Sequence, residues 1–315
     1  FCWDDVPAIV DVINRSDAVD RLGRDTSEDE VRTWWGAPRA RPERHAFLAV
    51  VGPEVVGYGR IQLRAGDQQN GFSKIQCYGR VLPEWRGHGI GTCSVFECER
   101  RARARVGEAT TATVYLEAYA DERQEDVAEL YAAFGLEPVR YFFDMVYDAR
   151  EPPAKPGYPP GYSARTFACG RDEERTWRVI NAAFSDHWGH IHIPLEEWLH
   201  WVDSALFDPN LAVLGIAPGG DVVGECLCTI DPEKNRWRGR EEGWVDSLGV
   251  RREHRGRGLG RAMLLEGMAG LRRRGCTQFM LGVDSDNPTG APHLYETVGF
   301  RKARTGVTYR KLLRG

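Results

Sequence analysis

The feature that most constrains this chain is a short motif of glycine and arginine that occurs twice. Its copies are Arg86-Gly87-His88-Gly89-Ile90-Gly91 and Arg255-Gly256-Arg257-Gly258-Leu259-Gly260. Each copy follows an apolar stretch, residues 75–82 or 243–250, and precedes a segment with helical periodicity. The start of a helix offers free backbone N–H groups, to which an anionic ligand can bind. The sequence therefore predicts two anion-binding loops.

The repeat extends beyond this motif to whole domains. The pair Leu130-Tyr131 with Gly135-Leu136 recurs as Leu294-Tyr295 with Gly299-Phe300, at nearly the same offset as the glycine motifs. Between the halves, residues 151–161 contain five prolines, which lack a backbone N–H and interrupt regular structure. We therefore expect an N-terminal domain at 1–150, a linker at 151–161 and a C-terminal domain at 162–315.

Composition narrows the class of function. A net charge of −4 gives no broad basic face for DNA or RNA. No apolar run reaches the roughly 20 residues of a membrane span, and no signal peptide is visible. The eight cysteines show no C-x-x-C pairs, which suits a reducing compartment. We expect a cytoplasmic protein with a small-molecule ligand, no metal, and neither a nucleic-acid nor a membrane partner; the oligomeric state is open.

Periodicity predicts the same order of elements in both halves. In the second half we expect strands at 162–167, 211–216, 222–230, 243–250, 277–283 and 301–313, and helices at 172–184, 195–204, after the glycine motif, and at 291–298. In the first half we expect strands at 46–51, 55–63, 75–82, 111–118 and 139–147, and helices at 6–14, after the glycine motif, and at 126–134. An opening strand is not apparent in the first half.

Two common phosphate-binding loops are excluded. A Walker loop requires Gly-Lys-Ser/Thr, and a dinucleotide fingerprint requires a third glycine where this chain has Thr92 and Arg261. What remains is Arg-x-x-Gly-x-Gly between a strand and a helix, with glycines that let backbone approach a ligand and an arginine that adds positive charge.

The element order, this motif and the later Leu-Tyr-x-x-x-Gly motif resemble the GNAT superfamily of acyl-CoA N-acyltransferases, twice in tandem. The resemblance implies an α/β (α+β) fold of two domains, each a mixed, mostly antiparallel sheet flanked by helices. It also implies acetyl-CoA (coenzyme A) as cofactor, with its pyrophosphate in the glycine loop and its pantetheine along a bulged strand. The implied cofactor-binding residues are Val81, Arg86, Gly87, His88, Gly89, Ile90, Gly91 and Thr92, and Leu248, Gly249, Val250, Arg255, Gly256, Arg257, Gly258, Leu259, Gly260, Arg261 and Asn287.

Acyl transfer to an amine requires a neutral amine, a donor to the developing oxyanion and a proton for the departing thiolate. The resemblance makes Tyr295 the residue that protonates the thiolate; a packed helix aromatic is the alternative. Asp246 is the candidate base because strand alternation places it on one face with Leu248 and Val250. A solvated or ion-paired carboxylate is the alternative for Asp246, and Glu242 and Asp284 are weaker candidates.

The two halves differ around these residues. Tyr131 matches Tyr295, but Arg123 stands where the second half has Asn287, for which an Asn-Pro turn is the alternative role. We therefore expect the first domain to bind cofactor less well or without turnover, and the second to be catalytic.

The acceptor pocket is expected in the loop between the first two helices of the second half, where His187, Trp188 and His190 would contact the substrate. The second half is also partly similar to the mycothiol synthase family in residues 181–184 and near Tyr295. However, Trp244 follows Gly243 where that family carries a glutamate, so mycothiol synthesis is not assigned.

Three functions remain open at this stage. The first is an N-acetyltransferase that moves an acetyl group to a small-molecule amine by direct attack, active in the second domain. The second is an acyl-CoA-binding regulatory or sensor protein without turnover. The third is a metal-dependent enzyme built on the histidine loop.

Overall fold

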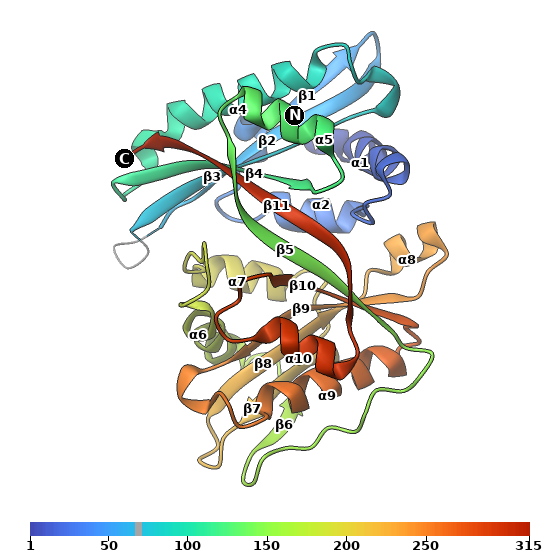
Figure 1. The fold of residues 1–315 in the computed structure, drawn as a ribbon, viewed down its shortest axis with the longest axis vertical. Helices are drawn as coiled ribbons and strands as arrows, with labels where there is room; N and C mark the ends of the chain where they lie inside the picture. Colours follow the sequence, from blue (N-terminus) through green and yellow to red (C-terminus); the bar gives the residue numbers. More distant parts are fainter. Residues whose placement is uncertain (67–70) are drawn as a thin grey trace. The chain divides into compact units, whose positions relative to one another are not determined.

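The computed structural model describes residues 1–66 and 71–315, which form two compact α/β units (Figure 1). Unit 1 comprises residues 1–141 and 305–315, and unit 2 comprises residues 142–304. Each unit has a mixed sheet with helices on both faces, so the predicted fold class is confirmed.

Unit 1 is built on strands β1 to β4 and the end of β11, in the order β1-β2-β3-β4-β11. Helices α4 and α5 enclose one hydrophobic cluster with this sheet, and α1 and α2 enclose a second. The elements are α1 (Val6–Asp20), α2 (Glu28–Trp35), α3 (Pro42–His45), β1 (Ala46–Val51), β2 (Glu54–Arg64), β3 (Phe72–Val81), α4 (Ile90–Arg105), β4 (Thr113–Asp121), α5 (Glu125–Ala133) and β11 (Arg301–Arg314).

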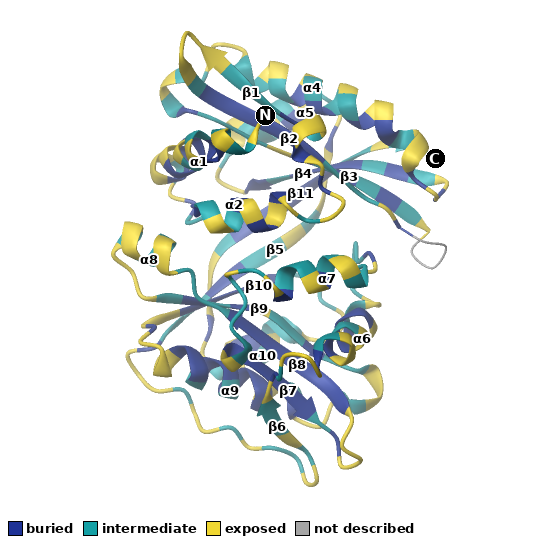
Figure 2. Ribbon diagram, turned by 180° about the vertical axis from the view of Figure 1, so that it is seen from behind, coloured by how far each residue is buried: buried dark blue, intermediate teal, exposed yellow. Residues whose placement is uncertain are grey.

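Unit 2 has the strand order β5-β10-β9-β8-β7-β6, in which only β9 and β10 are parallel. The apolar side of α9 is buried against β7 to β9, and α6 and α7 cover a separate cluster (Figure 2). The elements are β5 (Glu137–Asp148), β6 (Ser163–Thr166), α6 (Glu173–Phe184), α7 (Leu195–Val202), β7 (Ala212–Ile216), β8 (Val222–Thr229), α8 (Pro232–Arg238), β9 (Glu242–Val250), α9 (Leu259–Arg273), β10 (Gln278–Asp284) and α10 (Ala291–Val298).

The closing strand of each half completes the sheet of the other unit. Residues 142–148 of β5 pair antiparallel with β10, and residues 306–314 of β11 pair antiparallel with β4. The units therefore do not divide at the predicted boundaries of 150 and 162. The proline-rich segment 151–161 lies within unit 2, where Tyr158 packs against the core. Alternation along a strand specifies which face is buried but not which strand lies beside it, so sequence alone placed both strands in their own halves.

Most predicted elements are present with ends shifted by a few residues. Helix α1 continues to Asp20, and α2, α3 and α8 were not predicted. None of the described residues before β1 forms a strand, so unit 1 opens with helices.

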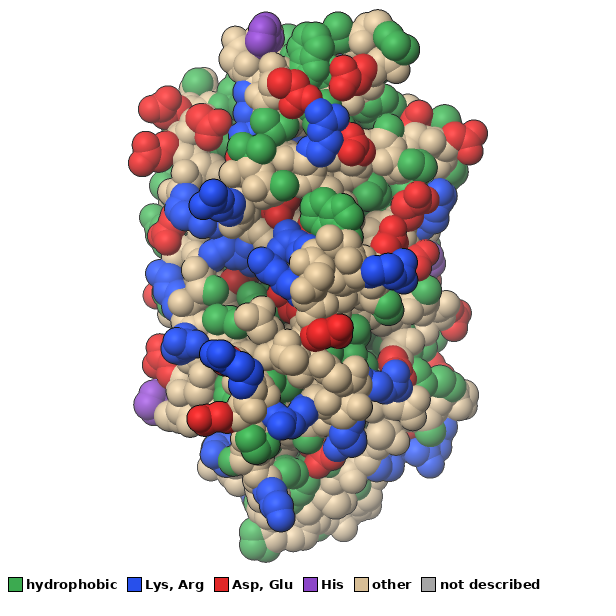
Figure 3. All heavy atoms as spheres, turned by 90° about the vertical axis from the view of Figure 1, so that its right-hand side faces the viewer, with side chains coloured by type: hydrophobic (Ala, Val, Ile, Leu, Met, Phe, Trp, Pro, Cys, Tyr) green, Lys and Arg blue, Asp and Glu red, His purple; other side chains and the backbone are tan. Residues whose placement is uncertain are grey.

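The surface of the molecule carries both signs of charge. On the face drawn in Figure 3, acidic and basic side chains are interspersed. In the part of the chain that the structure describes, no helix combines the length and apolar character needed to cross a membrane.

Candidate functional site

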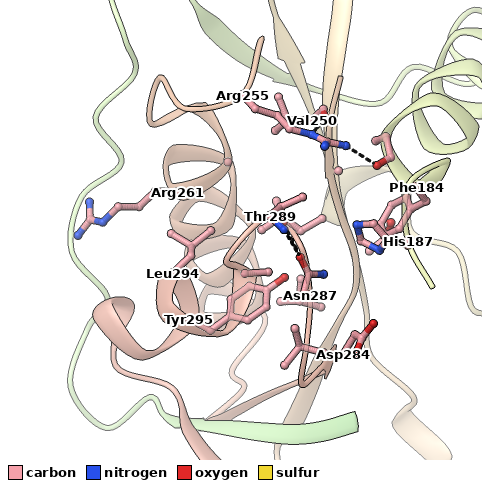
Figure 4. A pocket seen from close by; sticks show the side chains of 18 of the residues that line it. Phe184, His187, Val250, Arg255, Arg261, Asp284, Asn287, Thr289, Leu294 and Tyr295 are labelled. Carbon is pink, nitrogen blue, oxygen red and sulfur yellow. Dashed lines mark hydrogen bonds between the residues drawn. The ribbon is translucent and has the colours of Figure 1, made fainter. Parts of the chain in front are cut away.

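A cavity opens in unit 2 where two parallel strands separate. The last parallel pair of β9 and β10 is Val245 with Leu281, and beyond it the strands diverge. The opening has a volume of about 420 Å³ and is lined by the end of β9, the glycine loop, α6, β10 and α10 (Figure 4). Fourteen of the residues predicted for this half line it: Asp246, Leu248, Gly249, Val250, Arg255, Gly256, Gly258, Leu259, Gly260, Arg261, Asn287, Tyr295, His187 and Trp188.

A β-bulge shapes the wall that β9 contributes. Leu227 of β8 lies opposite Ser247. The next residue, Cys228, lies opposite Val245, so Asp246 is an extra residue in β9. A bulge bends its strand and redirects the following side chains. Asp246 is exposed at this bend and lines the cavity.

The glycine loop presents open backbone at the start of α9. Gly256 (φ 71°) and Gly258 (φ 88°) adopt the left-handed conformation, which other residues rarely adopt. Gly258 is the N-cap of α9 and has no side chain that could accept from the first amides of the helix. A Cβ added to either glycine would meet nothing within 4 Å. The loop thus fits an anionic group bound by backbone N–H donors and the positive end of the helix dipole.

Arg255 holds this loop in place through bonds within the protein. Its guanidinium donates to Asp186 Oδ2 at 2.7 Å, to the Ala183 carbonyl at 2.7 Å and to the Val250 carbonyl at 3.0 Å. The hydrogen bond from Arg255 also lowers the pKa of Asp186. These bonds tie the loop to α6 and to the end of β9, which favours a positioning role for Arg255. Its expected contribution of positive charge to a bound ligand stays a prediction.

Replacing Arg255 with lysine is expected to lower the free energy of unfolding by about 1–3 kcal/mol, because an ammonium cannot reproduce the three-way contact of the guanidinium. Chemical denaturation measures this change. The control is Arg261→Lys, an exposed side chain on the first turn of α9, for which we expect a change below about 0.5 kcal/mol. Equal effects of the two substitutions would contradict the positioning role.

Tyr295 and Asn287 approach the cavity from α10 and the loop before it. The Tyr295 side chain is buried and its hydroxyl points towards Asn287 (Figure 4). Burial raises the pKa of Tyr295, so the phenol stays protonated at neutral pH. The Asn287 Oδ1 accepts from the Thr289 amide at 2.9 Å and from its hydroxyl at 2.6 Å. Asn287 therefore shapes a turn and also lines the cavity.

The carboxylates considered from the sequence occupy different environments. Asp284 lines the cavity at the buried end of β10. Glu242 is not among the lining residues, and its carboxylate accepts a 2.7 Å hydrogen bond from Trp244 Nε1.

Sequence reasoning missed Glu225, a carboxyl beside the cavity. Glu225 is fully buried in β8, where it faces Gly249 of β9. Burial raises the pKa of Glu225 to about 8, although hydrogen bonds from Ser247 and the Gly249 amide oppose this shift. The available signal was a glutamate within an otherwise apolar strand, since a carboxyl is rarely fully buried unless it is paired.

Aromatic side chains line the side of the cavity next to α6. His187 lies 4.6 Å from Phe184, and Trp188 lies 6.2 Å from Phe142, measured between ring centroids. Burial lowers the pKa of His187. Two predicted residues, Arg257 and His190, are not among those that line the cavity. Among residues 1–66 and 71–315, no group of three or more His, Cys, Asp or Glu side chains could hold a metal ion.

Unit 1 has a related cavity of about 450 Å³. Strands β3 and β4 pair in parallel only as far as Cys77 and Ala118, and Gly87 and Gly89 adopt the left-handed conformation. Arg86 donates to Asp20 at 2.6 Å, as Arg255 does to Asp186. Of the residues predicted here, Val81, Arg86, Gly87, Gly89, Gly91 and Thr92 line this cavity, whereas His88 and Ile90 do not.

The surroundings of the unit 1 cavity differ from those in unit 2. When the glycine motifs are aligned, Gly249 corresponds to Arg80, and Glu225 corresponds to its β2 neighbour Tyr58. Arg123 pairs with Asp121 at 2.7 Å. Unit 1 thus retains the loop but has neither the buried carboxyl nor the bulge in its β2–β3 pairing.

Sequence comparisons match both halves of the chain to one family. A sequence model of the acetyltransferase (GNAT) family matches residues 10–136 and 173–300. A mycothiol acetyltransferase of Thermobispora bispora is 36% identical over 232 residues, which cover 73% of this chain and 74% of the relative. One of Salinispora arenicola is 29% identical over 315 residues, which cover 98% and 94%.

Solved structures share the whole arrangement of elements. A GCN5-related N-acetyltransferase from Sphaerobacter thermophilus has a TM-score of 0.77 at 31% identity and covers 100% of this chain and 95% of its own. A tandem GNAT protein from the clavulanic acid biosynthesis pathway has a TM-score of 0.71 at 17% identity, with 99% and 96% covered, and shows the same fold.

Proposed function

Because this chain belongs to the acetyltransferase (GNAT) family and is an acetyl-CoA-dependent N-acetyltransferase with the predicted tandem organisation, we propose that it acetylates the amine of a small molecule in the unit 2 cavity. One observation carries this proposal. The open glycine loop, the bulged strand and the Tyr295 hydroxyl all border one cavity. Such a cavity can hold the phosphates of the cofactor at the loop, position the thioester along the strand and supply a proton to the departing thiolate.

The residues of unit 2 fit acetyl-CoA, which supplies the acetyl group as a reactive thioester. We propose that the N–H groups at the start of α9 bind its pyrophosphate and that residues 248–250 contact its pantetheine. Tyr295 would donate a hydrogen bond, and then a proton, to the departing thiolate. Asp246, exposed at the bulge, would attract and orient the cationic amine. Its predicted role as base stays a prediction.

The names of the relatives and one difference in sequence from the mycothiol synthase family support the proposed class of acceptor. The relatives named mycothiol acetyltransferase favour a small-molecule acceptor. Trp244 occupies the place in β9 where the mycothiol synthase family carries a glutamate, which favours a different amine here. His187 and Trp188 would contact this acceptor. Eight free cysteines support a reducing cytoplasm as the compartment.

For unit 1 we propose acyl-CoA binding without turnover. This second function is favoured by its cavity, which has the same left-handed glycines but Tyr58 and Arg80 in place of the Glu225–Gly249 pair.

A matched pair of substitutions tests which unit is active. Aspartate tolerates left-handed backbone better than most residues, and at Gly258 it would place a negative charge where the pyrophosphate is proposed to bind. We expect Gly258→Asp to lower kcat/KM for acetyl-CoA on the order of 100-fold. Gly89→Asp, the same change in unit 1, should leave it within about threefold. The assay follows release of the coenzyme A thiol with a panel of amines, polyamines, amino acids and aminoglycosides.

The reverse pattern, in which Gly89→Asp removes turnover and Gly258→Asp does not, would move the reaction to unit 1. If the unaltered chain transfers acetyl groups to no member of the panel, the small-amine proposal fails. Calorimetry with acetyl-CoA on both variants counts the binding sites, and one site lost in each variant supports cofactor binding by both units.

A further inference from the structure

We propose that the carboxyl of Glu225 takes up the proton of the acceptor amine through the hydroxyl of Ser247. The proposal rests on acetyl transfer in unit 2 and adds the path by which the amine loses its proton. Glu225 itself does not line the cavity, but Ser247 does. The pair thus connects a buried acid with the space in which the amine is proposed to react.

The geometry of the pair supports this path. The Ser247 hydroxyl donates to Glu225 Oε1 at 2.8 Å. The other oxygen, Oε2, is buried without a hydrogen-bond partner. A fully buried carboxylate with one unpartnered oxygen is costly, so the protonated form is favoured in the resting protein. The ionised form that remains binds a proton tightly, and it is this form that accepts the proton passed on by Ser247.

The neighbours of Glu225 leave burial as the dominant influence. On β7 its register partner is Leu214, and the side chains of α6 that approach its β9 partner Gly249 are Ala183 and Phe184. On β9, Glu225 faces Ser247 and Gly249, and Asp246 is the residue before Ser247. On α9, Met263 packs against Gly224, the residue before Glu225. The titratable groups that interact with it electrostatically are Cys228 and Tyr295.

The proposed step balances its protons. A bound ammonium first releases one proton to solvent. The neutral amine nitrogen then forms a bond to the carbonyl carbon of the thioester, and the bond from that carbon to sulfur breaks. The nitrogen gives its proton to Ser247 Oγ while the Ser247 hydroxyl proton moves to Glu225 Oε1. Tyr295 gives its proton to the thiolate. After the products leave, exchange with solvent returns one proton to Tyr295 and removes one from Glu225.

Unit 1 has no such path, which agrees with one reaction centre. With the glycine motifs aligned, Ser247 corresponds to Tyr78 and Glu225 to Tyr58, both aromatic. A phenol stays protonated at neutral pH, so neither tyrosine supplies an ionised oxygen that could accept the amine proton.

The pH dependence follows from the ionised form being the proton acceptor. Burial raises the pKa of Glu225 to about 8, so the fraction able to accept a proton rises with pH up to that value. We therefore expect kcat/KM for the amine to rise about tenfold per pH unit below about pH 7.5 and to level off above pH 8.5. Among the amines that serve as substrates, the one with the lowest pKa is used, and its own pKa is measured so that its titration is distinguished from that of Glu225.

Glu225→Gln tests the path directly. We expect kcat to fall about 100-fold, the limb of the pH profile near 8 to disappear, and the Kd for acetyl-CoA to stay within twofold. Ser247→Ala should lower kcat about tenfold or more, and Ser247→Thr, which retains the hydroxyl, should restore most of it. Asp246→Asn should raise KM for the amine but leave the rise of the pH profile near 8 in place. A limb near 8 that persists in Glu225→Gln overturns the proposal, as does full activity of Ser247→Ala.

A stability measurement separates this proposal from the proposed function. The folded protein holds the Glu225 proton up to about pH 8, whereas the unfolded chain releases it at the usual carboxyl pKa. The stability that the protonated carboxyl provides is therefore lost as pH rises from about 5 to 8. The loss is measured as a fall in Tm with rising pH, and Glu225→Gln should make this fall smaller. If Tm of Glu225→Gln falls with pH as steeply as that of the unaltered protein, the assigned protonation state is overturned, even where acetyl transfer is found. If the fall is smaller in Glu225→Gln but no acetyl transfer is found, the result counts against the proposed function instead.

Discussion

Replacing Tyr295 with phenylalanine is expected to lower kcat for acetyl transfer about 100-fold or more, with the affinity for acetyl-CoA changed less than about threefold. The substitution removes one hydroxyl and leaves the ring, which packs with Phe300 at 6.1 Å between centroids. The hydroxyl is needed only as the carbon–sulfur bond breaks and negative charge develops on sulfur, so its loss should appear in kcat. Because burial raises the pKa of Tyr295, the loss should not depend on pH below about 9.

The equivalent tyrosine in unit 1 provides the control. Tyr131 is buried in the same way, and its hydroxyl donates to the Tyr119 carbonyl at 3.4 Å. We expect Tyr131→Phe to leave kcat within twofold. Steady-state kinetics measure both variants, and calorimetry measures acetyl-CoA binding. A Tyr295→Phe enzyme that retains half or more of its turnover would show that the thiolate leaves without this donor.

The glycine loop was predictable because its requirements are local. A left-handed backbone before a helix favours glycine, so Gly256 and Gly258 identify the loop in the sequence itself. Tyr295 and Asn287 were predicted as neighbours of this loop by resemblance, and they do line the same cavity. Their chemical roles stay predictions, because shared lining alone does not demonstrate proton transfer.

The features that escaped prediction depend on partners distant in sequence. Strand β5 pairs with β10 of the second half, and β11 pairs with β4 of the first half. The alternation of apolar residues along a strand does not encode which of two similar strands becomes its neighbour. A bulged strand before the glycine loop was expected by resemblance, but the position of the bulge at Asp246 depends on how β9 pairs with β8. Glu225 could not be linked to Ser247 for the same reason, since 22 residues separate them.

Two missed helices did carry local signals. Ser27 caps α2 by accepting from the Glu30 amide, in the pattern of a capping box. Asp231 caps α8 by accepting from two amides, and Gly239 ends it in the left-handed conformation. Both helices have fewer than nine residues, so their periodicity was too short to recognise.

Substituting Gly249 with alanine is expected to remove activity and to lower the free energy of unfolding by about 1–3 kcal/mol. A Cβ at this position would lie 2.6 Å from Glu225 Oε1 and 3.0 Å from the Ala183 Cβ. The first contact requires either the Glu225 carboxyl or β9 to shift, and the second requires a displacement of a few tenths of an ångström between β9 and α6, so we expect β9 to move. That movement would displace the backbone proposed to contact the pantetheine. Chemical denaturation and the thiol-release assay measure the two effects.

Gly282 is the matched control, since it lies in β10 on the wall of the same cavity and a Cβ there would meet only Asp144 Oδ1, at 3.9 Å. Gly282→Ala should change stability by less than about 0.5 kcal/mol. In a double-mutant cycle, Glu225→Ala removes the nearest contact of the new Cβ, so Gly249→Ala should cost less stability in that background. If the stability losses of the two substitutions are additive, Gly249 is required for a reason other than the close approach of Glu225. If the double variant recovers stability but not activity, the packing of this pair is separated from its proposed chemistry.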